Sequence, residues 1–306
     1  MKDFLAFHGY SKNFNFKILC DTLVDFGYTV DRVDETRILN FPYGERYKYI
    51  IMCWHSENIH YKFIKNLMKS KYTDVPMILF DDTDWNHKTM KFAKEPFVVF
   101  KRELTERTRR IREVPYYQMA KIVRDNYHPE IEKVYDVSFV GSITSKSRAA
   151  FLDKIRQIKR ETWFIHETKH SEDMPYDEYI KIINQSKIGL SYFGNGYDTV
   201  RYWEIISCKT ALLSPVVPLP IENNLSKEDA VFFKDDMSDL EENIDYLLKG
   251  DRWKIFAENA YRAFIVHHSN IVRTKEFLAK IDAAFEIFEQ KQKREKGLIH
   301  TVRKWF

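Results

Sequence analysis

Short apolar runs alternate with stretches of helical spacing along most of this chain. In its first part the apolar runs cover residues 2–7, 29–33, 48–54, 76–80 and 97–100. A second series begins at residue 135 and continues over residues 163–166, 188–193, 211–213 and 231–233. Helical spacing separates many of these runs, and strands that alternate with helices predict parallel sheets covered by helices on both faces.

The two series predict two Rossmann-like βα domains in an α/β fold. We expect the first over residues 1–130 and the second over 131–285, with a boundary in the mixed connection Tyr116–Lys133. The remaining residues, 286–306, are expected to form a C-terminal helix or tail that returns to the first domain, or else a frayed basic tail. At 306 residues the chain is long enough for two such domains.

Net charge, cysteine content and the lengths of the apolar runs indicate the compartment and the kind of partner to expect. The formal net charge is only +4, which permits an anionic partner without requiring one. Three cysteines without metal spacing suggest a reducing compartment. The first residues lack the pattern of a secretory signal, and no apolar run approaches the roughly 20 residues that span a bilayer. We therefore expect a cytoplasmic protein, in a bacterium or in a phage-infected host.

The most informative stretch is IGLSYFGNGYDTVRYWEIISCKTALLSP, from Ile188 to Pro215. It predicts a strand, a glycine turn, a helix over residues 199–207 and another strand. Backbone N–H groups and the helix dipole converge at such a turn, which suits a phosphate or another anion. The residues predicted to hold a nucleotide here are Gly194, Gly196, Asp198, Thr199, Arg201 and Glu204. Asp198 or Thr199 can cap the helix.

An ordinary βαβ unit explains the same letters. Arg201 and Glu204 are three residues apart and thus share a helix face, so they can form a simple surface ion pair. The stretch alone does not decide between the two interpretations.

Two further segments resemble a known family. YDVSFVGSITSKSRAAFLDKI, from Tyr135, resembles the segment that opens the second domain of CgeB-like glycosyltransferases. YIKIINQSKIGLSYFGNGYDTVRYWEIISCKTALLSP resembles the nucleotide segment of the same group and, more loosely, that of exostosin-like enzymes. The sequence Phe100–Glu103 also resembles a segment that ends the first domain in this group. The resemblance implies a GT-B fold, with a central cleft and C-terminal helices that cross back, and a hexosyl- or pentosyltransferase. In that fold residues 1–130 would form the acceptor domain and residues 131–285 the nucleotide-sugar donor domain.

The resemblance also implies roles for individual residues. Glu204 would bind the ribose of a nucleotide-sugar donor, expected to be a UDP-sugar, and Arg201 would lie near the pyrophosphate. The residues that would complete the donor site are Gly141, Ser142, Arg148, His166, Tyr192, Gly194 and Gly196. Gly141-Ser142 is expected to form a turn. One departure is Cys208-Lys209-Thr210, which stands where the family usually ends the helix with glycine.

An acidic loop follows the apolar run at residues 76–80. An inverting transferase needs a general base at the acceptor hydroxyl, and the candidates are Asp81, Asp82 and Asp84. These residues can equally cap the next helix. Asp82-Thr83-Asp84 also matches the D-x-D pattern of metal-dependent transferases, so Mg²⁺ or Mn²⁺ is possible, although no obligatory metal is expected.

A basic run follows the apolar run at residues 97–100. Its six basic residues are Lys101, Arg102, Arg107, Arg109, Arg110 and Arg112. Clustered arginines beside aromatic residues suit a phosphate backbone, and they suggest modified DNA as acceptor, such as a hydroxymethylpyrimidine base. A solvated helix face explains the run as well. The alternatives are a polysaccharide or glycan acceptor, or a non-catalytic nucleotide- or DNA-binding protein on the same scaffold.

Overall fold

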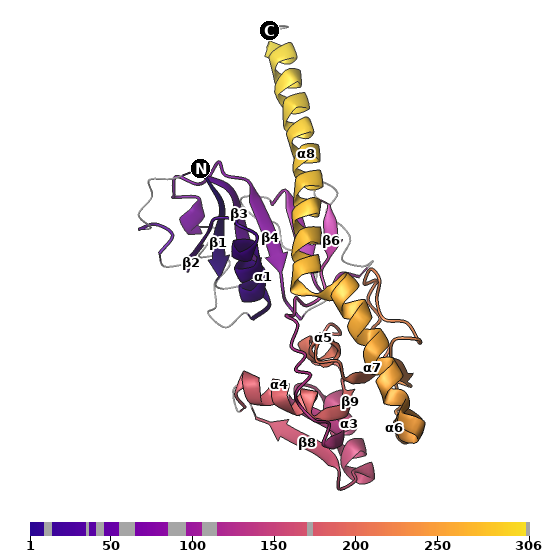
Figure 1. Ribbon diagram of the computed structural model, residues 1–306. Helices are drawn as coiled ribbons and strands as arrows, with labels where there is room; N and C mark the ends of the chain where they lie inside the picture. Colours follow the sequence, from indigo (N-terminus) through magenta and orange to yellow (C-terminus); the bar gives the residue numbers. More distant parts are fainter. Residues whose placement is uncertain are drawn as a thin grey trace. The chain divides into compact units, whose positions relative to one another are not determined.

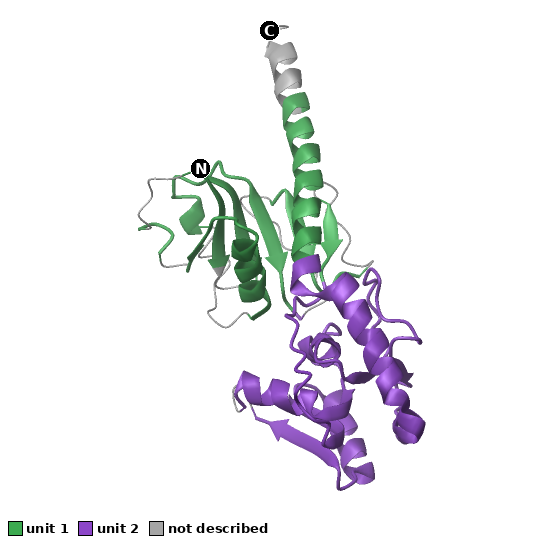
Figure 2. Cartoon of the chain, viewed as in Figure 1, with its two compact units in different colours: residues 1–83, 87–119, 273–306 green, residues 84–86, 120–272 purple. Residues whose placement is uncertain are grey.

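The structure is a computed structural model that describes residues 1–8, 14–34, 37–40, 46–54, 65–84, 96–105, 115–169 and 174–303, without the side chains after residue 294. The chain divides into two compact units (Figure 2). The first contains residues 1–83, 87–119 and 273–306, and the second contains residues 84–86 and 120–272. The expected acceptor and donor assignments of residues 1–130 and 131–285 stay predictions, because compactness does not show what a unit binds.

The first unit is built on a parallel sheet (Figure 1). Among the described residues its strand order is β2-β1-β3-β4-β5-β6. The strands are β1 (Lys2–His8), β2 (Val30–Val33), β3 (Tyr47–Trp54), β4 (Met77–Asp81), β5 (Val98–Lys101) and β6 (Tyr116–Gln118). The central strands β4 and β5 are buried throughout, as parallel strands covered on both faces should be. The short strand β6 was not expected from the sequence.

Two long helices accompany this sheet in the described part of the first unit. They are α1 (Phe14–Asp25) and the part of α8 (Asn270–Arg303) that follows residue 272. Helix α8 packs on the unit through three aromatic side chains. The ring of Phe277 contacts Phe100, and the rings of Phe285 and Phe288 contact Phe97. Phe277 and Phe285 precede the expected tail of residues 286–306, and Phe288 lies within it. Residues 65–67 are helical as well.

The second unit contains another parallel sheet, with the described strand order β11-β10-β9-β7-β8. The strands are β7 (Tyr135–Ser142), β8 (Trp163–Thr168), β9 (Ser186–Leu190), β10 (Ala211–Pro215) and β11 (Val231–Phe233). Strand β9 begins and ends earlier than expected. Gly141 and Ser142 are the last two residues of β7, so the expected turn at these residues is wrong.

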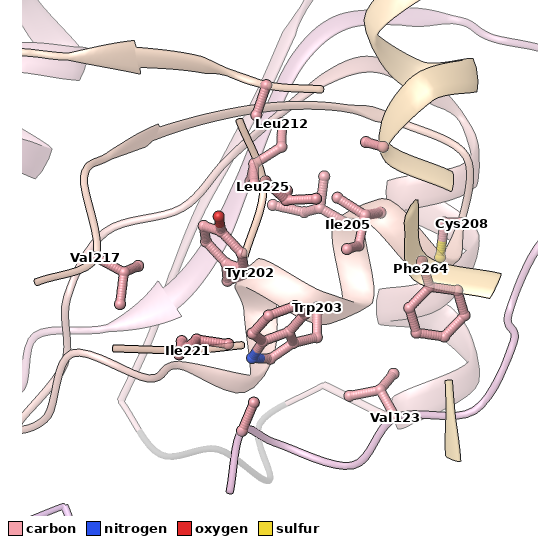
Figure 3. Close-up of a cluster of buried hydrophobic side chains, with 14 of the residues drawn as sticks. Val123, Tyr202, Trp203, Ile205, Cys208, Leu212, Val217, Ile221, Leu225 and Phe264 are labelled. Atoms are coloured by element: carbon pink, nitrogen blue, oxygen red, sulfur yellow. The ribbon is translucent and has the colours of Figure 1, made fainter. Parts of the chain in front are cut away.

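Helices cover both faces of this second sheet. They are α3 (Lys146–Ile158), α4 (Tyr176–Asn184), α5 (Val200–Ser207), α6 (Leu240–Leu248) and α7 (Arg252–Ala263), followed by a π-helical turn (Phe264–His268). One face carries a core that includes Phe139 and Phe151, and the other carries a core around α5. Figure 3 shows this second core, in which Trp203 and Ile205 of α5 lie among aliphatic side chains.

Two parallel sheets, each alternating strands with helices, confirm the predicted α/β class with two Rossmann-like domains. Within the described ranges, no helix combines the length and the low polarity that crossing a membrane requires.

Candidate functional site

The topology of the second sheet marks one place for a ligand. Strands β7 and β9 are neighbours in the sheet. After β7 the chain continues to β8 at one edge, whereas after β9 it continues to β10 on the other side, so the strand order switches between β7 and β9. Ligands of open α/β sheets bind at the carboxyl ends of strands at such a switch point. Strand β7 ends there at Ser142, and the glycine loop at residues 192–197 follows β9.

Arg148 joins the ends of these two strands. Its guanidinium donates from Nε to the Phe193 carbonyl at 2.7 Å, from Nη2 to the Tyr192 carbonyl at 2.8 Å and from Nη1 to the Ser142 carbonyl at 3.2 Å. A Cβ atom at Gly194 would lie 3.1 Å from Nη2. The side chain is buried, so Arg148 fixes the loop around a buried positive charge.

Arg201 lies beside it, in the first turn of α5. Its Cζ atom lies 4.5 Å from the centroid of the Phe139 ring, a cation–π geometry. A Cβ atom at Gly141 would stand 2.1 Å from Nη2 of Arg201, so the guanidinium occupies the space that a side chain there would fill. Nε and Nη1 of Arg201 are buried and make no hydrogen bond within the described part of the chain.

The two arginines form an electropositive pair. Burial, and next the charge of Arg201, lower the pKa of Arg148 to about 9, while Asp84 acts in the opposite direction. Two neighbouring cations, one buried and one half-buried, are costly unless an anion compensates them. The pair therefore suits a ligand with two or more negative charges, such as a diphosphate.

Glu204 is the other member of the predicted motif, and it is buried. Its Oε2 atom accepts from the Tyr179 hydroxyl at 2.8 Å. Burial raises the pKa of Glu204, and hydrogen bonds from Tyr179 and Tyr176 and the charges of Arg201 and Lys121 lower it. The carboxylate thus lies in a frame of hydrogen-bond donors and cations. Sequence reasoning missed Tyr176, Tyr179 and Lys121, because no local spacing links them to the motif.

The start of α5 differs from the expectation of a side-chain cap. Thr199 is the N-cap residue but makes no capping hydrogen bond with its side chain. Asp198 is buried and accepts from the Trp203 indole at 2.6 Å and from the Lys121 backbone N–H at 3.0 Å. The Thr199 side chain therefore does not cap the helix as expected, and the Asp198 carboxylate binds the Trp203 indole and the Lys121 N–H.

The structure shows how α5 ends at Lys209, where the resembling family usually has a glycine. Lys209 has φ 51° and donates its N–H to the Ile206 carbonyl at 3.1 Å, while Thr210 donates to the Ile205 carbonyl at 3.3 Å. These bonds form a Schellman motif, in which glycine is the usual left-handed residue. Lys209 is held there by an ion pair with Glu258 at 2.7 Å. The helix therefore ends in the usual geometry without the glycine.

Three other residues predicted for the donor site are Tyr192, Gly196 and His166. Tyr192 is buried in the core, with its ring stacked on Phe151 at 4.5 Å. Gly196 accepts from the Gly194 N–H at 3.1 Å, which closes the loop. His166 lies in the edge strand β8, paired with Val140 next to the end of β7. Their roles toward a donor stay predictions.

The acidic loop and the start of the basic run form one buried network in the first unit. Lys101 donates to Asp81 at 2.7 Å, and both side chains are fully buried. Arg102 donates from Nε to Asp82 at 2.8 Å and contacts Glu103 at 3.1 Å. The prediction that Lys101 and Arg102 contact a DNA backbone is wrong, because both cations are buried against carboxylates.

The same network bears on the remaining expectations. Asp82 also accepts from Asn15 at 2.9 Å, and a carboxylate that already binds a guanidinium does not fit a divalent metal. Asp81 is committed to Lys101 and Thr83. Asp84 is half-buried and groups with the second unit. The other four basic residues, Arg107, Arg109, Arg110 and Arg112, lie outside the described residues.

Comparison with known families gives one match. Residues 130–279, just under half of the chain, match the model of a glycosyl transferase-like family. Comparison with curated proteins gives no match. The finer grouping with CgeB-like or exostosin-like enzymes stays a prediction.

Several solved structures share the fold. A glycosyltransferase from Rickettsia africae has a TM-score of 0.60 at 8% identity, over 93% of this chain and 98% of that protein. HepE from Anabaena, in complex with UDP, has a TM-score of 0.56 at 8% identity, over 92% and 100%. The pneumococcal O-GlcNAc transferase GtfA, in complex with UDP and GlcNAc, has a TM-score of 0.51 at 10% identity over 78% of this chain. This chain spans 57% of the length of GtfA.

At sequence identities this low, the similarity to these structures shows only that the folds are alike. A shared glycosyltransferase fold is consistent with the family match. Residues 130–279 are thus similar to the glycosyl transferase-like family, and the chain has the fold of the GT-B glycosyltransferases.

Proposed function

We propose that the protein transfers a sugar from a nucleotide sugar to an acceptor hydroxyl. One observation carries this proposal: Nε and Nη1 of Arg201 are buried without a hydrogen-bond partner in the described part of the chain, beside Arg148 at the switch point. Each unsatisfied buried donor costs about 1–3 kcal/mol, and more when it is charged. A diphosphate beside this guanidinium would compensate its charge, and it is the group that a nucleotide-sugar donor carries. The family match over residues 130–279 supports the same activity.

The donor is expected to be a UDP-sugar. HepE and GtfA, which share the fold, were solved with UDP. In this proposal Arg201 and Arg148 stabilise the charge that develops on the leaving diphosphate. Glu204 accepts from the ribose hydroxyls. No step in this scheme requires a metal.

A general base is needed if the transfer inverts the sugar. Of the three candidates, we favour Asp84. Asp81 and Asp82 are held in buried ion pairs, whereas the charge of Asp84 acts on Arg148 of the proposed donor site.

The acceptor is a second part of the proposal. Modified DNA loses support, because Lys101 and Arg102 are buried in ion pairs. A carbohydrate acceptor is not affected by that burial. The two acceptors are distinguished by incubating the protein and a UDP-sugar with hydroxymethylated duplex DNA or with glycan acceptors, followed by mass spectrometry of each product.

The test of the donor half uses a panel of nucleotide sugars. Thermal stabilisation by one of them, followed by release of its nucleoside diphosphate, would support the proposal. Arg201→Ala should weaken both effects, whereas Arg156→Ala should change neither, because Arg156 lies exposed on α3 of the same unit. Stabilisation without any turnover would favour a non-catalytic nucleotide-binding protein. If the panel gave neither effect, the proposed function would be wrong.

A further inference from the structure

The segment that enters the second unit, residues 120–134, is called the connector here. It lies against α5, the helix that carries Arg201 and Glu204. Ala120 and Val123 belong to the same apolar core as Trp203, and Figure 3 shows Val123 and Trp203 in that core. The Asn270 N–H also donates to the Val123 carbonyl at 3.0 Å. The connector is thus part of the packing that holds α5.

Polar bonds fix the connector at the beginning of α5. Asp198, two residues before the helix, accepts from the backbone N–H of Lys121 at 3.0 Å. Its other oxygen accepts from the Trp203 indole at 2.6 Å. One buried carboxylate therefore ties the connector to a core side chain of α5.

A second set of bonds fixes the connector at the end of α5. The Asn126 backbone N–H donates to the Ser207 carbonyl at 3.3 Å, and its Nδ2 atom donates to the Ser207 hydroxyl at 3.2 Å. Asn184 of α4 donates to the Asn126 carbonyl at 2.9 Å and accepts from the His128 N–H at 3.0 Å. Asn126 is thereby held between α4 and α5.

Asn126 also reaches the hydroxyl group that supports Glu204. Its Nδ2 atom donates to Tyr176 Oη at 3.3 Å. Because that oxygen accepts from Asn126, its own proton is directed to the other partner, the Glu204 carboxylate, with which Tyr176 hydrogen bonds. Burial, and next the charge of Glu204, raise the pKa of Tyr176, so the hydroxyl keeps the proton that it donates.

We propose that the connector positions the Glu204 carboxylate through a hydrogen-bond relay from Asn126 to Tyr176 to Glu204, which makes Asn126 and Tyr176 positioning residues of the nucleotide site. This inference rests on the proposed function, since it assumes that Glu204 accepts from the ribose hydroxyls. It adds that the segment entering the unit helps to set the geometry of donor binding.

The relay predicts a pH dependence. The groups that act on Glu204 are Tyr179, Tyr176, Arg201, Lys121 and Cys208. Removal of the Tyr176 hydroxyl takes one hydrogen bond from the carboxylate and leaves the other groups in place. The carboxylate of the variant then takes up a proton at a higher pH. As pH is lowered, nucleotide affinity should therefore begin to fall at a higher pH in the variant than in the wild type.

The experiment is titration calorimetry with UDP from pH 5 to pH 8. We expect Tyr176→Phe to weaken UDP binding at pH 7 by about tenfold, the order expected for one lost hydrogen bond to a charged group. We also expect it to move the midpoint of the pH profile upward. Asn126→Ala should shift the profile in the same direction. Tyr261→Phe is the matched control, because its hydroxyl donates to Asp125 of the same connector at 2.9 Å.

A UDP analogue without the two ribose hydroxyls separates positioning from a general structural effect. The loss caused by Tyr176→Phe should disappear with this analogue, because no hydroxyl remains for Glu204 to bind. Equal losses for both ligands, or a Tyr176→Phe profile that matches Tyr261→Phe, would overturn the inference and leave the proposed function standing. A wild-type protein that binds no UDP would overturn the inference in this form, and the panel of nucleotide sugars would then decide the proposed function.

Discussion

Gly141→Ala tests whether Arg201 is placed for a phosphate. The structure puts a Cβ atom at this position 2.1 Å from Nη2 and 3.0 Å from Cζ of Arg201. An unstrained contact needs about 3.5 Å, so the guanidinium must retreat by about 1.4 Å. Gly141 lies in β7 outside the left-handed region, so alanine fits the backbone there. The clash falls on the end of a flexible side chain, and the free energy of unfolding should change little.

The expected effect on binding follows from that displacement. A hydrogen bond of about 2.9 Å between Arg201 and a phosphate would be broken by a shift of this size. A hydrogen bond to a charged group contributes about 1.5–3 kcal/mol, so UDP affinity should fall roughly 10- to 150-fold. Uridine, which lacks the phosphates, should bind to the variant and to the wild type alike.

The assay is titration calorimetry of both ligands, with thermal unfolding monitored in parallel. In an Arg201→Ala background, Gly141→Ala should cause no further loss, because the two changes remove one interaction. The reasoning would be refuted by a Gly141→Ala protein that binds UDP as tightly as the wild type. Additive losses in the double variant, or equal losses for UDP and uridine, would refute it as well.

Three further predictions concern stability. A Cβ atom at Gly189 would lie 2.7 Å from Ile205, so Gly189→Ala should lower the free energy of unfolding by about 1–3 kcal/mol, and an unchanged urea midpoint would contradict this. Lys101→Met leaves the buried Asp81 carboxylate without its cation and should destabilise the protein by about 3–5 kcal/mol, whereas Lys101→Met combined with Asp81→Leu should recover most of the loss. Burial raises the pKa of Glu204, so the stability that its neutral form gives is present below the ordinary glutamate pKa and is lost as pH rises through the raised value. Glu204→Gln should therefore gain stability relative to the wild type between pH 5 and pH 8 in urea denaturation, and a constant difference would contradict the sign.

Much of the fold could be predicted because its signals are local. Apolar runs such as KYIIMCW in β3 and PMILF before Asp81 have the length and composition of buried strands, and the intervening periodicity marks the helices. The spacing of Arg201 and Glu204 put them on one turn of α5. Their partners could not be read in the same way, since Tyr179 precedes Glu204 by 25 residues and meets it only when α4 and α5 pack.

The charged residues show the limit most clearly. In the sequence, Asp81 and Asp82 suit catalysis, and Lys101 and Arg102, twenty positions later, suit a polyanion. The parallel register of β4 and β5 sets Asp81 opposite Lys101, and the next pair follows at the strand ends. The sequence did contain one signal for this pairing. Asp81 and Asp82 come at the end of one buried strand, and Lys101 and Arg102 come at the end of the next.

By itself, the sequence determined the succession of strands and helices, and hence two parallel sheets, because side-chain periodicity acts between near neighbours. Only the tertiary structure decided which charges are neutralised and which are left for a ligand. That outcome depends on distances between residues far apart in the chain: it pairs Asp81 with Lys101, and it leaves Arg201 beside Arg148 with two buried donors unsatisfied by the described residues.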